Sequence, residues 1–162
     1  MFTSIRSRFY DDFQPQQTQC VNRTGGALSA GDVVALDLTG SDADVEAYSD
    51  YNARTDKEST HPFANVIAPA TAHLEGWVFV VATEAVADDA VGWFTQYGVV
   101  DVLVATGTSA GDQLSGTNAS NTLDGIGAGE AVLALLLEDN SSGSDATRPA
   151  IFNGMAVGGG AS

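Results

Sequence analysis

Short apolar runs, separated by clusters of turn-forming residues, make up most of the chain after residue 20. Such runs recur at 33–38, 76–82, 90–97, 99–105, 131–137 and 150–157. The breaks between them are rich in Gly, Asp, Ser, Asn and Thr, which end strands and form turns. Runs this short, with turn signals at both ends, are typical of β-strands. The sequence therefore predicts a mainly β fold, a small antiparallel β-barrel or sandwich.

A small-Ala-Gly-acidic pattern occurs three times, at 29–32, 109–112 and 127–130. It predicts a turn in which the glycine has a positive φ and the acidic side chain accepts backbone N–H bonds before a strand begins. The unequal spacing of the three segments excludes a solenoid period. We interpret them as turns rather than as marks of a repeat.

The ends of the chain and one internal segment differ from this β-rich body, which we place at 21–157. Residues 1–20 mix Gln, Arg and aromatic residues without a helical or strand period, which predicts an extended N-terminal arm that orders against another surface. Residues 40–62 are polar and acidic and predict a long surface loop. The glycine-rich residues 158–162 predict a flexible tail.

The charge of the chain is strongly negative and unevenly distributed. The 162 residues carry 21 acidic and 6 basic side chains, a formal net charge of -15. Such a surface repels phosphate groups, so we expect neither a nucleic acid nor an anionic membrane as partner. Residues 1–23, with three arginines against two aspartates, are slightly basic. The arm is therefore suited to an acidic surface that the body would avoid.

The chain also carries information about the compartment in which it is made. Cys20 is the single cysteine, so neither an internal disulfide nor a cysteine-based metal site is expected. No apolar run is long enough for a transmembrane helix, and the N-terminal sequence MFTSIRSRFYDDF lacks the apolar region of a signal peptide. We expect synthesis and folding in a cytoplasm.

Side chains suited to catalysis are scarce. His61 and His73 are too far apart in the sequence to form one of the close pairs that place two imidazoles on one helix face. Cys20 falls in the predicted arm, away from any apolar cleft. Glycine-rich segments lack the Lys-Ser/Thr that follows a phosphate-binding loop. We therefore expect no enzymatic activity, no catalytic residues, no metal and no cofactor.

Four motifs follow one another in the middle of the chain: GWVFV at 76–80, GWFTQYGVV at 92–100, GDQL at 111–114 and AVLAL at 131–135, with FNG at 152–154 near the end. This succession resembles the head decoration, or capsid cement, proteins of tailed phages. The resemblance covers about half of the chain and does not include the acidic segment 40–62. It implies a β-rich body, often trimeric, on the outer capsid surface where major capsid subunits meet.

The resemblance also implies a role and a set of contacts. The protein would be a virion structural protein that decorates and stabilises the outer capsid, binding the major capsid protein and itself as a homotrimer. Aromatic and arginine side chains dominate interface energetics, so we expect the arm to bind the shell through them. The expected capsid-binding residues are Phe2, Arg6, Arg8, Phe9, Tyr10 and Phe13.

Two alternatives remain open. One is another virion component, such as a tail or fibre protein, which would have the same composition. The other is a Ca²⁺- or carbohydrate-binding β module. The oxygens of Asp42, Asp44 and Glu46 suit Ca²⁺, and an exposed Trp77 or Trp93 would suit a sugar. The strand-like context of both tryptophans predicts that they pack in the core instead.

Overall fold

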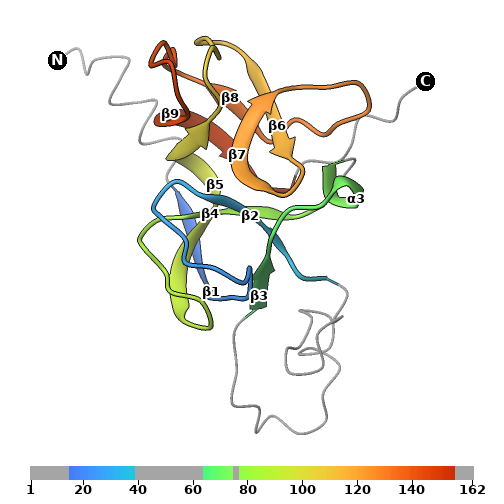
Figure 1. The fold of residues 1–162 in the computed structure, drawn as a ribbon, viewed down its shortest axis with the longest axis vertical. Coiled ribbons are helices and arrows are strands. Elements are labelled where there is room, and N and C mark those ends of the chain that lie inside the picture. The colour runs from blue at the N-terminus through green and yellow to red at the C-terminus, as the bar shows by residue number, and fades with distance from the viewer. Residues whose placement is uncertain (1–14, 39–63, 75–76, 156–162) are drawn as a thin grey trace, which may run out of the picture.

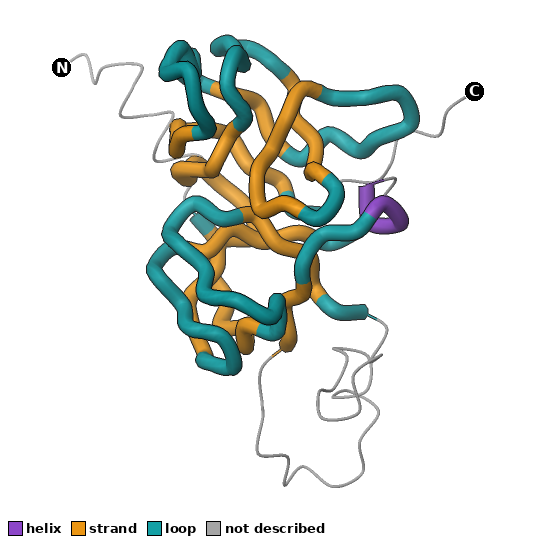
Figure 2. Tube along the Cα trace, in the orientation of Figure 1, coloured by secondary structure: helices purple, strands orange, loops and turns teal. Residues whose placement is uncertain are grey.

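Nine strands form one continuous sheet in the computed structural model, which describes residues 15–38, 64–74 and 77–155. The mainly β fold predicted from the sequence is confirmed. The elements are β1 (Gln16–Asn22), β2 (Val33–Leu36), β3 (Ala64–Ile67), α3 (Thr71–Leu74), β4 (Phe79–Ala82), β5 (Val91–Val104), β6 (Gln113–Thr117), β7 (Ser120–Gly125), β8 (Ala134–Leu136) and β9 (Ala146–Asn153). Figure 2 shows the short helix α3 at one side of the strands.

The sheet closes into two five-stranded barrels that share β5. The first barrel has the order β1-β3-β2-β4-β5 and is closed by pairing of β1 with β5. The second has the order β5-β7-β6-β8-β9 and is closed by pairing of β5 with β9. Figure 1 shows β1 to β4 in the lower half and β6 to β9 in the upper half, with β5 between them.

The second barrel repeats the topology of the first, shifted by four strands. In each barrel the first pair is parallel, β1 with β3 and β5 with β7. The remaining pairs of each ring are antiparallel. β5 is thus the last strand of one barrel and the first strand of the next.

The shared strand β5 is 14 residues long, about 45 Å at the usual rise per residue. The sequence predicts two strands here, at 90–97 and 99–105, separated by Gly98. The structure has one strand that runs through Gly98, whose φ is +119°. Only glycine adopts this conformation readily, so the residue that looks like a strand break allows the strand to change direction between the barrels.

The strands β2 and β4 are buried on both faces. Val33, Ala35 and two residues of β4, Phe79 and Val81, pack with the core of the second barrel. Their alternate neighbours pack with the core of the first barrel. This explains why β2 reads as an uninterrupted apolar run: a strand covered on both sides does not alternate apolar and polar residues. β2 and β4 therefore lie between the two cores and pack with both.

The three acidic turns form as predicted. Their glycines have positive φ, and the first residue of each turn donates its N–H to the carboxylate of the fourth at 2.8, 2.7 and 2.7 Å. The interpretation that they mark no repeat is wrong for the first two. The turn at 29–32 leads into β2, and the turn at 109–112 leads into β6, the equivalent strand of the second barrel. The wide separation of these two turns in the sequence therefore reflects the repeated topology.

Two predicted boundaries need correction. Residues 16–20, assigned to the arm, belong to β1, and Cys20 is fully buried. The sequence does not indicate this strand, because its first four residues, Gln16 to Gln19, are all polar. Its pairing partners, β3 and β5, are also distant in sequence. The last strand, predicted at 150–157, is β9 at Ala146–Asn153. The segments 1–14, 40–62 and 158–162 lie outside the described residues.

Candidate interaction surfaces

The expected capsid-binding residues lie outside the described residues: Phe2, Arg6, Arg8, Phe9, Tyr10 and Phe13. The structure does describe where this segment joins the body. Gln16, the first residue of β1, pairs with Tyr97 of β5, and Tyr97 pairs on its other side with Asn153 of β9. The arm therefore joins the body at the middle of the shared strand, where the two barrels meet.

An apolar patch lies beside this junction, on the outside of the second barrel. Leu135 of β8 pairs with Ile151 of β9, which pairs with Val99 of β5, so the three side chains form a row on one face of the sheet. Leu137 extends the patch, because its N–H donates to the carbonyl of Pro149 in β9. We call these four residues, Val99, Leu135, Leu137 and Ile151, the second-barrel face.

Exposure separates this face from the core behind it. Leu135 is 38% exposed and Leu137 is 37% exposed, whereas Leu136 between them is 1% exposed. Val99 and Ile151 are half-buried. The sequence predicts a buried strand at 131–137 and gives no sign of this face, because both sides of the strand are apolar and a period of two is invisible in such a run.

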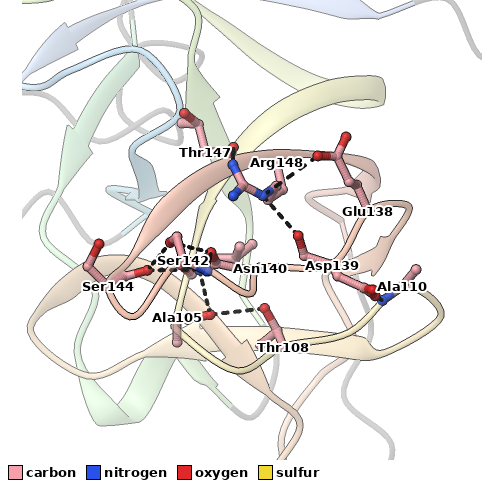
Figure 3. Close-up of polar contacts among 11 residues, drawn as sticks. Ala105, Thr108, Ala110, Glu138, Asp139, Asn140, Ser142, Ser144, Thr147 and Arg148 are labelled. Atoms are coloured by element: carbon pink, nitrogen blue, oxygen red, sulfur yellow. Dashed lines mark hydrogen bonds and ion pairs between the residues drawn. The ribbon is translucent and has the colours of Figure 1, made fainter.

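The rim of the second-barrel face is acidic. Asp101 pairs with Pro149 in the row that contains Leu137, and Glu138 and Asp139 follow Leu137 directly. All three acidic residues are exposed. Arg148, the single cation in the described part of the second barrel, donates from Nε to the carbonyl of Asp139 at 3.0 Å and lies 3.9 Å from a carboxylate oxygen of Glu138 (Figure 3).

One buried asparagine fixes the loops next to this rim. The side-chain amide of Asn140 donates to the carbonyls of Val104, Ala105 and Ser144 at 3.0 to 3.1 Å. Its oxygen accepts the hydroxyl of Ser142 at 2.7 Å. Figure 3 shows these contacts gathered around the Asn140 side chain. These hydrogen bonds hold the loop before β9 against the end of β5, so the loop loses little conformational entropy when a partner binds.

In the first barrel, Asn22 makes the corresponding hydrogen bonds. The amide of Asn22 donates to the carbonyls of Gly26, Val86 and Ala87, and its oxygen accepts the hydroxyl of Thr24 at 2.8 Å. In both barrels one asparagine joins the loop after the first strand to the loop before the fifth. Sequence reasoning missed both residues, because a buried Asn in a polar loop resembles any other turn residue.

A second, smaller apolar patch lies on the first barrel. Trp93 is 45% exposed and Val91 is 44% exposed, both on β5. The prediction that Trp93 packs in the core is therefore wrong, because the residue lies on the outward side of its strand. Trp77 is half-buried, as its Nε1 donates to the carbonyl of Leu36 at 2.6 Å and its ring stacks on His73 at 4.6 Å between centroids.

Two of the candidate catalytic residues, Cys20 and His73, are among the described residues. Burial raises the pKa of the Cys20 thiol from 9.0 to about 12, which makes it a poor nucleophile. Burial lowers the pKa of His73, an effect partly offset by the charge of Asp37, and its Nδ1 accepts the N–H of Ala70 at 3.1 Å. His61 lies outside the described residues.

Two further kinds of feature are absent from the described ranges. No group of three or more His, Cys, Asp or Glu side chains there is arranged to hold a metal ion. The acidic residues Asp42, Asp44 and Glu46 are not among those described. No described helix has the length and hydropathy needed to cross a bilayer.

Comparison with known proteins shows a likeness in structure. No protein-family model and no curated protein sequence matches the chain. Among solved structures, the head fiber gp8.5 N base of bacteriophage phi29 superposes with a TM-score of 0.50 over 87% of this chain and 98% of that chain, at 12% sequence identity. At this identity the likeness establishes a shared fold, extending over nearly the whole of both chains.

Proposed function

We propose that this protein is a phage virion structural protein that decorates and stabilises the outer surface of the head. It would bind the major capsid protein and further copies of itself, as a homotrimer, and would have no enzymatic role. The observation that carries the proposal is the shared fold with a phage head fiber base, which covers 87% of this chain. The motif resemblance to head decoration proteins supports the same role independently.

The architecture suits a protein that binds through side chains on a rigid body. Every described strand pairs with a neighbour on both sides, so the barrels offer no free edge for strand addition. The loops at the ends of both barrels are fixed by Asn22 and Asn140. A capsid repeats the same surface many times, so modest contacts per copy suffice for retention.

The N-terminal arm is the proposed attachment element. Phe2, Phe9, Tyr10 and Phe13 would insert into apolar pockets of the shell, where aromatic anchors contribute most to binding. Arg6 and Arg8 would pair with acidic groups of the capsid protein, which the body, with a net charge near -16 beyond residue 23, would otherwise repel. The proposed attachment element would continue from Gln16, which pairs with Tyr97 where the two barrels meet.

A co-sedimentation experiment tests the proposal. Purified protein is mixed with phage capsids that lack their decoration protein, and bound and free fractions are measured after centrifugation. The matched variant removes residues 2–14, which stops short of β1. We expect saturable binding of the full chain and at least tenfold weaker binding of the truncated chain, as hot-spot anchors are lost. Equal binding of both would exclude the arm, and absence of saturable binding would exclude decoration.

A fibre component is the second candidate, because the structural neighbour is itself the base of a head fiber. The two roles differ in where the density of the protein lies on the particle. Cryo-electron microscopy of particles carrying this chain distinguishes them: a decoration protein lies flat on the shell, whereas a fibre base carries a projection away from it. Light scattering of the free protein measures the predicted trimer separately.

A further inference from the structure

The second-barrel face combines two exposed leucines with two half-buried aliphatic residues on neighbouring strands. Val99, Ile151 and Leu135 lie on three adjacent strands, and neighbouring strands are about 4.8 Å apart. The row therefore extends about 10 Å across the sheet. Leu135 and Leu137 each remain more than a third exposed. Grouped apolar side chains rimmed by polar residues mark binding sites more often than single exposed ones do.

The position of the face relative to the arm indicates what covers it. Val99 lies shortly after Tyr97 on the same face of β5, and Tyr97 pairs with Gln16, where the arm joins the body. The face therefore begins next to the root of the arm. The segment 1–14 can span at most about 45 to 50 Å when extended. The arm therefore keeps any surface that it binds within about 50 Å of its root, next to which the face lies.

Charge argues against a second copy of the body as the occupant. The described residues carry twelve carboxylates against two arginines, a net charge of -10. Asp101, Glu138 and Asp139 form the rim of the face, and the arginine nearest to it, Arg148, already contacts Glu138 and Asp139. Two such rims in contact would bring like charges together. A partner with an apolar centre and basic residues around it would complement the face.

We infer that the second-barrel face is the footprint of the body on the same shell subunit that the arm binds. The subunit would present an apolar patch to Leu135, Ile151 and Val99, with Lys or Arg side chains opposite Asp101 and Glu138. Arm and face then form one continuous interface, in which the arm supplies anchors and the face sets the orientation of the barrels. This inference rests on the proposed function and assigns the surface that it uses.

Substitutions in the full-length protein test the face. Leu135→Asp places a charge at the β8 end of the row, and Ile151→Thr removes apolar surface from its middle while keeping a β-branched side chain that suits a strand. Val91→Asp is the matched control, since Val91 is an exposed strand residue of the first barrel at 44% exposure. Each variant is checked for folding by circular dichroism and for oligomeric state by light scattering. Its affinity for capsids lacking the decoration protein is then measured by co-sedimentation at two salt concentrations.

We expect Leu135→Asp to weaken capsid binding about tenfold or more and Ile151→Thr to weaken it less, while Val91→Asp binds as the unmodified protein does. Binding of the unmodified protein should also weaken as salt screens the rim. Unchanged binding of both face variants would overturn the inference. A changed oligomeric state with unchanged binding would also overturn it, because the face would then join copies of the chain. If the unmodified protein does not bind capsids, the proposed function fails first.

Discussion

Asn22 and Asn140 make equivalent contacts in the two barrels. Each links the end of the first strand of its barrel to the loop before the fifth strand, but the two residues lie on opposite sides of this link. Asn22 ends the first strand of its barrel and contacts the loop before the fifth. Asn140 lies in the loop before the fifth strand and contacts the end of the first. Both are buried, and both amides donate to three carbonyl oxygens.

Replacing either asparagine by alanine should lower the free energy of unfolding by about 3 kcal/mol, because buried carbonyl groups lose their donors. Asn118→Ala is the control, since Asn118 is exposed in the turn between β6 and β7, and should cost less than about 0.5 kcal/mol. Urea denaturation measures all three. Similar values for Asn140 and Asn118 would show that the Asn140 contacts do not stabilise the fold.

Gly31 and Gly111 occupy the same position of equivalent turns, with φ of +95° and +93°, but differ in their surroundings. A Cβ at Gly111 would meet open space, so Gly111→Ala should cost only the backbone strain, about 1 kcal/mol. A Cβ at Gly31 would overlap Cγ2 of Thr147, which should raise the cost to about 3 kcal/mol.

The difference between these glycines is testable with one further substitution. Thr147→Ser removes the methyl group and should return much of the lost stability of Gly31→Ala. A double-mutant cycle from thermal or urea unfolding gives the coupling. Independent effects of the two substitutions would show that the turn relaxes away from Thr147.

Truncation of the two adjacent leucines of β8 should lower the free energy of unfolding by different amounts. Leu136→Ala removes a side chain that is 1% exposed and should lower the unfolding free energy by about 3 kcal/mol through the cavity it leaves. Leu135→Ala should cost less than about 1 kcal/mol, since much of that side chain already contacts water. Equal losses in the free protein would mean that Leu135 belongs to the core.

The buried thiol should make the free energy of unfolding decrease at alkaline pH. The pKa of Cys20 is raised by burial from 9.0 to about 12, so the folded state favours the neutral thiol. Its contribution to stability is complete below pH 9 and decreases as the pH rises toward 12. Cys20→Ala should show a weaker decline over this range than the unmodified chain in urea denaturation. A thiol reagent should react at pH about 8 only after unfolding.

Local features of the fold could be predicted from the sequence, whereas non-local ones could not. The acidic turns were predicted correctly, because each depends on a glycine and a carboxylate within a single turn. The doubled topology was missed, because β1 pairs with β5 although β2, β3 and β4 lie between them in the chain, and no local pattern records such pairing. The sequence predicts a break at Gly98 because a glycine between apolar runs has the same appearance in a turn and in a bent strand.

The candidate surface shows a different limit. The arm was identified by its basic and aromatic composition, and it remains a prediction. The second-barrel face could not be identified, since Leu135 and Leu137 are exposed and Leu136 is buried although all three are the same residue type. Only the register of β8 against β9 assigns one of them to the core.

Sharing β5 has a consequence for how the protein comes apart. Two separate five-stranded barrels would need ten strands, whereas this chain builds both with nine. A cut in β5 opens both rings, and removal of the second barrel exposes the face of β2 and β4 that packs with its core. We therefore expect the two barrels to unfold together as one cooperative unit.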